Sequence, residues 1–162
     1  GDSIISKIYQ KIGVETIYKE DSIIISKNKK INPPERIKLD LTETPDLAQT
    51  IAVCCLGLGI ECELSGLHTL KIKETDRIEA IKKEFIKLGV ENIKTSDNSI
   101  YFKGDQKLNH DIKINTYQDH RMALSFSTLA VIIDISIDSP NVVSKSFPKY
   151  WENLITLGFK IN

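Results

Sequence analysis

The sequence contains an internal repeat, which limits the possible folds more than any other feature. Residues 3–28 and residues 76–104 share one pattern: a helix with an apolar stripe, then Lys-x-Gly-Val-Glu, then two short strands around a polar turn. A third, shorter copy is FPKYWENLITLGFKIN. A glycine ends each predicted helix, at Gly13, Gly89 and Gly158, where a left-handed C-cap is favourable. We expect such a chain to fold as copies of one small unit that pack on one another.

A second repeated pattern lies between these copies. Residues 36–66 begin with an alternating strand, continue into a helix from about Asp46 and end in a second alternating strand. Residues 111–140 repeat this order, with the helix beginning at Asp119 and the last strand running through residues 133–137. Joined together, the two patterns give a unit of strand, helix, strand, helix, strand and strand.

The chain holds one complete unit, from about Arg36 to Lys103, and the unit after it lacks only its last strand. Before them lies a piece that begins directly with a helix and a hairpin, so a strand, a helix and a strand are expected ahead of Gly1 in the complete protein. We therefore expect residues 1–162 to be one domain, formed by about two units and the remnant of a preceding one, within a longer protein.

The apolar pattern of the helices indicates how the layers are arranged. The helices expected at residues 47–58 and 122–133 are apolar nearly all round, which predicts that they are buried. The helix after Asp76 keeps a charged face. The predicted fold class is therefore α+β (mixed α/β), with helices inside and sheets outside.

Composition excludes several classes of function. Lys plus Arg (22) balances Asp plus Glu (22), so no positive field exists to attract a nucleic acid. No apolar run is long enough to cross a membrane and no signal segment opens the chain, which favours a cytoplasmic protein. The three cysteines, Cys54, Cys55 and Cys62, lie in apolar segments without metal-ligand spacing and are predicted to be core thiols. Nothing in the sequence predicts a metal or a cofactor.

Polar clusters recur where the predicted helices begin. They are TPDLAQT (residues 44–50), KETDR (73–77), QDHRMA (118–123) and SKSFPKYW (144–151). Thr44 is the expected N-cap of its helix, and carboxylates at a helix N-terminus are favoured by the helix dipole. Cations there are not, and a bound anion would remove the conflict. The clusters occupy equivalent edges of one repeat, so they are expected to converge.

Each cluster also has a purely structural interpretation. Asp46 taken alone is a common first-turn carboxylate, and His120 taken alone is a common capping or surface histidine. Glu74 with Arg77 would then be a solvated ion pair that contributes less than about 1 kcal/mol. The recurrence of the clusters at equivalent points favours a functional site over these separate explanations.

These four motifs together resemble the C-terminal domain of the 5-enolpyruvylshikimate-3-phosphate (EPSP) synthase family, the 3-phosphoshikimate 1-carboxyvinyltransferases, over essentially the whole chain. The resemblance implies transfer of the enolpyruvyl group of phosphoenolpyruvate to the 5-hydroxyl of shikimate 3-phosphate, in aromatic amino acid biosynthesis. It also implies two domains that close over both substrates. The sister family, which acts on UDP-N-acetylglucosamine, lacks this combination of KETDR and DHR motifs and fits less well.

The resemblance assigns catalytic roles to three residues. Asp46 corresponds to the carboxylate that faces the 5-hydroxyl, Glu74 to the proton donor for the phosphoenolpyruvate methylene, and Lys73 to a lysine shared between the substrates. An acid and a base held close together suit a reaction that protonates one substrate and deprotonates the other.

The resemblance also implies substrate-binding roles for five residues. The cations that would hold the carboxylate and phosphate of phosphoenolpyruvate, and the residues that would orient them, are Arg77, Arg121, Lys145, Asp119 and His120. The family's N-terminal domain, which completes both substrate sites, has no counterpart in this sequence. The chain alone is therefore expected to be inactive. The alternative is a free-standing, non-catalytic binding module on the same scaffold.

Overall fold

The computed structural model describes residues 2–162, and it confirms the repeat. The first copy consists of a short 3-10 helix at Asp2–Ile4, helix α1 (Ile5–Gln10) and an antiparallel hairpin of β1 (Val14–Tyr18) and β2 (Ile23–Lys27). The glycines that follow α1, α3 and α5 all have positive φ angles, +88° at Gly13, +95° at Gly89 and +98° at Gly158. The predicted left-handed helix ends are confirmed.

The second copy is complete, as predicted. Its elements are β3 (Arg36–Asp40), a 3-10 turn (Pro45–Leu47), α2 (Ala48–Gly57), β4 (Glu61–Ser65), a 3-10 helix (His68–Ile72), α3 (Arg77–Lys87), β5 (Lys94–Ser96) and β6 (Ser99–Phe102). The four strands form one sheet in the order β3-β4-β6-β5. Strands β3 and β4 are parallel because α2 connects them, and β6 returns antiparallel to β4.

The third copy differs from the expectation in two places. Its elements are β7 (Ile112–Ile114), α4 (His120–Phe126), a 3-10 helix (Ser127–Val131), β8 (Ile135–Ile137), a 3-10 helix (Pro140–Lys145) and α5 (Tyr150–Thr156). The helix expected at 122–133 stops being α-helical at Phe126, where the hydroxyls of Ser127 and Thr128 donate to carbonyls three residues back. The strand that the repeat implies after the last helix does not form: residues 159–162 are neither helix nor strand, and no other described segment pairs with them.

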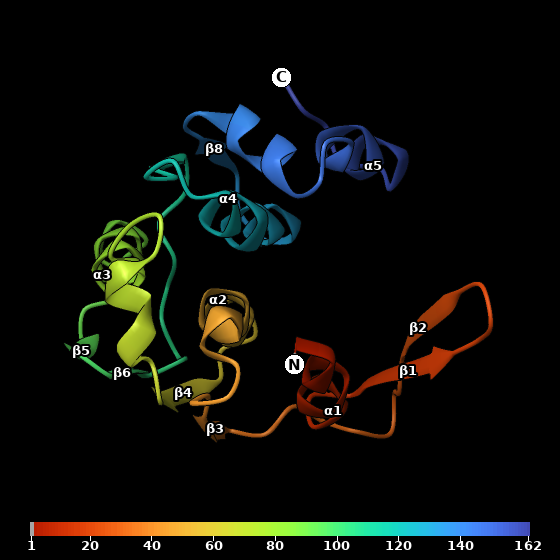
Figure 1. Ribbon diagram of the computed structural model, residues 1–162, viewed down its shortest axis with the longest axis horizontal. Helices are drawn as coiled ribbons and strands as arrows, with labels where there is room; N and C mark the ends of the chain where they lie inside the picture. The colour runs from red at the N-terminus through yellow and green to blue at the C-terminus, as the bar shows by residue number, and fades with distance from the viewer. Residues whose placement is uncertain (1) are drawn as a thin grey trace.

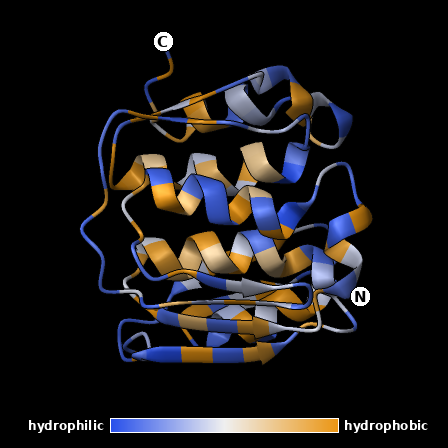
Figure 2. Cartoon of the chain, turned by 90° about the vertical axis from the view of Figure 1, so that its left-hand side faces the viewer, coloured by the Kyte–Doolittle hydropathy of each residue, from blue (hydrophilic) through white to orange (hydrophobic). Residues whose placement is uncertain are grey.

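The layers follow the prediction that helices lie inside and strands outside. In Figure 1, α2 and α4 lie next to each other in the middle of the molecule and the strands run along its outer rim. Helix α2 is buried on nearly every side, as its uniform apolarity predicted. In the side view of Figure 2, the helices form rows above the strands at the bottom, with apolar residues recurring along each row.

An aromatic cluster joins three of these elements. Phe85 of α3 makes edge-to-face contacts with Phe102 of β6, at 5.0 Å between ring centroids, and with Phe126 of α4, at 5.9 Å. All three rings are fully buried. This contact fixes the position of α3 against the four-stranded sheet and against the C-terminal end of α4.

The β1–β2 hairpin departs from this pattern of burial. It projects away from the rest of the chain in Figure 1, and no residue of either strand is fully buried. In the equivalent hairpin, Ile100 and Phe102 are completely covered because β6 pairs with β4. Strands β1 and β2 have no such neighbour among residues 2–162, so their apolar side chains remain exposed, including Ile25 at 69%.

Two further expectations concern the cysteines and the membrane. Cys55 and Cys62 are buried, Cys54 is half-buried, and all three are free thiols, as predicted. None of the helices described within residues 2–162 has the length and apolarity needed to cross a membrane.

Candidate functional site

The polar motifs converge on Arg77, the first residue of α3. Its guanidinium donates from Nε to Asp119 Oδ2 at 2.6 Å and from Nη2 to Asp119 Oδ1 at 3.3 Å. The same group reaches Asp46 at 2.8 Å and Glu74 at 2.9 Å. Only 2% of the Arg77 side chain is exposed, and Asp119 is completely buried. Carboxylates from three separate motifs therefore meet on one arginine.

Three more cations surround this centre on its exposed side. Lys73 Nζ lies 3.2 Å from Asp46 Oδ1, and Lys145 Nζ donates to Glu74 Oε1 at 2.6 Å. Arg121 donates to the Asp46 carbonyl at 3.2 Å and lies 3.6 Å from its carboxylate. Exposure of the side chain rises from 29% at Arg121 and 32% at Lys73 to 61% at Lys145. We call these four cations and three carboxylates the ion-pair cluster.

Helix starts place two of the carboxylates. Asp76 caps α3 by accepting from the Glu79 N–H at 3.0 Å, which sets Glu74 and Arg77 on either side of the cap. Asp119 caps α4 by accepting from the Arg121 N–H at 2.8 Å while it binds Arg77. An N-cap carboxylate that also faces a guanidinium holds two motifs together at once.

The expected N-cap at Thr44 is wrong. The Thr44 side chain makes no capping hydrogen bond, and residues Pro45–Leu47 form a 3-10 turn before α2 begins at Ala48. The carboxylate of Asp46 is directed to Arg77 and Lys73 rather than to the backbone of its own helix. The ion pairs of the cluster outweigh a local cap at this position.

The expected conflict between the cations and the helix dipoles holds for only two of the four cations. Lys145 is the last residue of a 3-10 helix and Lys73 follows the end of another, where the dipole favours positive charge. Arg77 and Arg121 do lie in the first turns of α3 and α4, but carboxylates of the cluster compensate them. Each cation therefore has a structural partner, and a binding role must rest on exposure and on the family.

The electrostatics of the cluster fix the charge state of Glu74. The hydrogen bond from Lys145 lowers the pKa of Glu74 to about 2, helped by a backbone hydrogen bond and by the charge of Arg77. Glu74 is therefore ionised at neutral pH. Burial lowers the pKa of His120, and its Nδ1 has no partner among the described residues. His120 is thus a neutral imidazole beside the cluster.

Two residues that help to build this site lie outside the four polar motifs. Glu84, in the middle of α3, is completely buried and accepts a 2.6 Å hydrogen bond from Tyr117, which precedes the QDHRMA motif by one residue. The available signal was a carboxylate seven residues after Arg77, on the same face of a predicted amphipathic helix.

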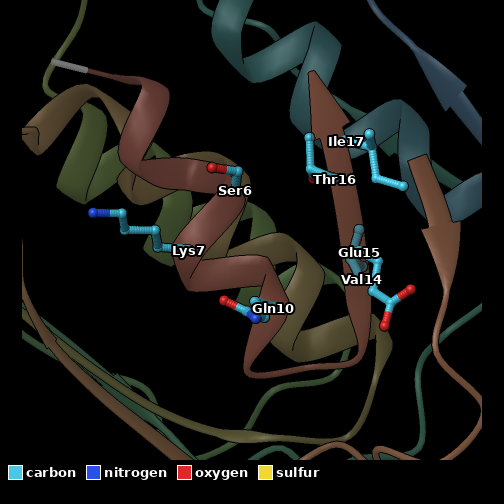
Figure 3. Close-up of a pocket in the computed structure, with 7 residues that line it drawn as sticks. All are labelled: Ser6, Lys7, Gln10, Val14, Glu15, Thr16 and Ile17. Carbon is cyan, nitrogen blue, oxygen red and sulfur yellow. The ribbon is translucent and has the colours of Figure 1, made fainter. Parts of the chain in front are cut away.

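A surface pocket of about 280 Å³ lies elsewhere. Figure 3 shows it between α1 and β1, lined by Ser6, Lys7, Gln10, Val14, Glu15, Thr16 and Ile17. It shares no lining residue with the ion-pair cluster and none with the four polar motifs. Within residues 2–162, no group of His, Cys, Asp and Glu side chains could hold a metal ion. The cluster remains the candidate site.

Comparison with known proteins identifies the family. The sequence profile of EPSP synthase (3-phosphoshikimate 1-carboxyvinyltransferase) matches residues 1–154. The chain belongs to the EPSP synthase family. A 3-phosphoshikimate 1-carboxyvinyltransferase of Bacteroides fragilis is 42% identical over 99% of this chain, and that of Saccharolobus solfataricus is 37% identical over 100% of this chain. The first match covers 39% and the second 38% of the relative, so the chain spans about two-fifths of these EPSP synthases.

Solved structures agree on the fold. An EPSP synthase of Acinetobacter baumannii superposes with a TM-score of 0.73 at 21% identity, over 96% of this chain and 39% of that one. This likeness confirms the mixed α/β fold class predicted from the repeat.

Proposed function

We propose that this chain is one domain of a two-domain EPSP synthase, the C-terminal part, and that it acts with an N-terminal domain outside residues 1–162. The proposed enzyme transfers the enolpyruvyl group of phosphoenolpyruvate to the 5-hydroxyl of shikimate 3-phosphate and releases phosphate, in the cytoplasm and without a cofactor. The observation that carries this proposal is the convergence of Asp46, Lys73 and Glu74 with three further cations in a member of this family.

Phosphoenolpyruvate would bind at the exposed side of the cluster. Four cations of the cluster face its three carboxylates, and Arg121 also lies 3.7 Å from Asp2, so an anionic ligand would bind by replacing the carboxylate partners of the exposed cations. Lys145, Arg121 and Lys73 are the members that solvent reaches, and guanidinium and ammonium groups suit carboxylate and phosphate oxygens. Arg77 is buried among its carboxylates and would act by holding Asp46 and Glu74 in place.

The charge state of Glu74 connects substrate binding to proton transfer. Glu74 carries no proton while Lys145 donates to it, so it cannot act as an acid in this state. A substrate phosphate that accepts from Lys145 would remove the largest cause of the low pKa, and the charge of the phosphate would raise that pKa further. Glu74 could then take up a proton and deliver it to the methylene carbon.

Asp46 would act on the other substrate. Protonation of the methylene leaves positive charge on the adjacent carbon, the 5-hydroxyl oxygen bonds to that carbon, and its proton passes to the Asp46 carboxylate. The resulting tetrahedral intermediate loses a proton from its new methyl group and expels phosphate, which restores the double bond. Lys73, 3.2 Å from Asp46, is placed to stabilise both the carboxylate and the leaving phosphate.

The test is a phosphate-release assay on the full-length protein whose reading frame contains this chain. Phosphate release that requires both phosphoenolpyruvate and shikimate 3-phosphate is the expected result. Absence of release with this pair, or release with a UDP-linked amino sugar in place of shikimate 3-phosphate, would reject the proposal. A reading frame without a second domain would favour a binding module instead.

A further inference from the structure

Glu84 anchors the segment that carries the third polar motif. Its Oε1 accepts from the Tyr117 hydroxyl at 2.6 Å, and its Oε2 accepts from the Asn115 N–H at 3.1 Å and from Lys87 Nζ at 2.7 Å. Lys87 also donates to the Lys113 carbonyl at 3.2 Å. A buried carboxylate on α3 is thus bonded at several points to the loop that leads from β7 to α4.

The loop that Glu84 holds is strained. Tyr117 and Gln118 have φ angles of +54° and +59°, two consecutive residues in the left-handed region. Neither is a glycine, so this conformation costs free energy and persists only where surrounding contacts enforce it. The next residue, Asp119, is extended, and it is the buried N-cap that binds Arg77.

The two attachments of this loop lie on one face of α3. Arg77 and Glu84 are seven residues apart, two helical turns, so both point toward the loop. Arg77 binds the loop after the strained turn, at Asp119, and Glu84 binds it before and within the turn, at Asn115 and Tyr117. Burial and the Glu84 carboxylate raise the pKa of Tyr117, so its hydroxyl stays protonated and remains a donor.

We propose that Glu84 and Tyr117 are positioning residues for the proposed transferase. Their hydrogen bond holds the left-handed turn at Tyr117 and Gln118, and the turn sets Asp119 where it can bind Arg77 and cap the helix that carries Arg121. Loss of the bond would let the turn relax and would displace the phosphoenolpyruvate cations. The effect on the reaction rests on the function proposed above, whereas the effect on the turn does not.

The first experiment measures the turn in this chain alone. Hydrogen exchange is followed at the amides of Asn115, Asp119 and Arg121, each of which donates in or beside the loop. Tyr117→Phe removes the hydroxyl and keeps the ring, and we expect exchange at these amides to become at least tenfold faster. Glu84→Gln keeps an acceptor but loses the charge, and it should also accelerate exchange at these amides. This second variant replaces the first in the test if Tyr117→Phe folds poorly.

The matched control is Tyr150→Phe. It also loses a 2.6 Å hydroxyl hydrogen bond, to Ser127, together with a 3.3 Å bond to the Leu124 carbonyl, but Tyr150 lies outside the loop. Exchange at the three amides should stay within twofold of the parent chain. Gln118→Asn should rescue the Tyr117→Phe variant, because asparagine adopts the left-handed region more readily than glutamine. Unchanged exchange in Tyr117→Phe, or the same acceleration in Tyr150→Phe, would overturn the proposal that the Glu84–Tyr117 hydrogen bond holds the turn.

The second experiment measures the reaction in the full-length enzyme. Tyr117→Phe should lower kcat/KM for phosphoenolpyruvate about tenfold, mainly through KM, with Tyr150→Phe within twofold and the Gln118→Asn double variant partly restored. A faster-exchanging loop with unchanged kcat/KM would overturn the role in the reaction. If the unsubstituted enzyme releases no phosphate, the proposed function fails. The exchange rates then decide by themselves whether the Glu84–Tyr117 hydrogen bond holds the turn.

Discussion

Arg77 and Asp119 are 42 residues apart in the sequence and form a two-point ion pair that is almost completely excluded from water. The pair joins the start of α3 to the start of α4, and thus the second structural copy to the third. Burying two charges is costly, and the pair is tolerated because its geometry is good and because Asp46 and Glu74 complete the coordination of the guanidinium. It forms the structural centre of the candidate site.

Removal of one member of this pair should destabilise the fold. Asp119→Ala leaves a buried guanidinium short of a partner and an uncapped α4, which should cost about 3 to 5 kcal/mol in the free energy of unfolding. Urea denaturation of this chain measures the loss. Asp97→Ala is the control, because its pair with Lys71 is exposed to solvent and should contribute nothing measurable. Equal losses in the two variants would contradict a structural role for the buried pair.

Neutral replacements of the proposed acid and base should abolish most turnover. Glu74→Gln and Asp46→Asn in the full-length enzyme keep shape and lose proton transfer, which should lower kcat by about 10² to 10⁴-fold. Glu79→Gln is the matched control, since Glu79 lies on the same helix but pairs with Lys83 at the surface. Phosphate release within tenfold of the parent for both site variants would reject the assigned roles.

The low pKa of Glu74 predicts a pH dependence of stability. The folded pKa of about 2 lies below the ordinary value of 4.5, so the stabilisation is complete above about pH 4.5 and is lost as the pH falls toward 2. Lys145→Gln removes the largest cause and should raise the pKa of Glu74. NMR titration of the Glu74 carboxyl carbon measures the pKa directly. An unchanged titration in the variant would show that Lys145 does not control this carboxyl group.

Binding of phosphoenolpyruvate to this chain alone should be weaker than millimolar. Lys73, Arg121 and Lys145 would be its contacts, and exposed ion pairs each contribute about 0.2 to 1 kcal/mol. Together they give at most about 3 kcal/mol, whereas a Kd of 1 mM requires about 4.1 kcal/mol. An NMR titration at physiological salt tests this. Saturation at micromolar ligand, or turnover with shikimate 3-phosphate, would show that the site is complete without a second domain.

The exposed hairpin should make this chain self-associate. Strands β1 and β2 present Ile17, Tyr18 and Ile23–Ile25 to solvent, and exposed apolar strand edges favour association. Light scattering over a hundredfold range of concentration should show a rising average mass. Replacement of Ile23 and Ile25 by lysine should restore a monomer, while the same change at Ile86, an exposed apolar residue on α3, should not. A parent chain that stays monomeric throughout would contradict this expectation.

The sequence by itself determined the repeat, the order of elements in the complete copy and the burial of α2. These features depend on local periodicity and on glycines such as Gly89, whose left-handed conformation is set by the adjoining residues. Local patterns were also enough to show which polar motifs would converge, because equivalent positions of one repeat fall at the same edge of the fold.

Only the tertiary structure decided which partner each polar side chain takes. Thr44 does not make its expected cap, and Lys73 and Lys145 lie at the C-terminal ends of 3-10 helices that periodicity did not predict. Arg77 is compensated by carboxylates up to 42 residues away. The pairing of Glu84 with Tyr117 was likewise out of reach, since 33 residues separate them. Charges interact through space over several ångströms and not along the chain, so their pairing is fixed only when packing has brought the elements together.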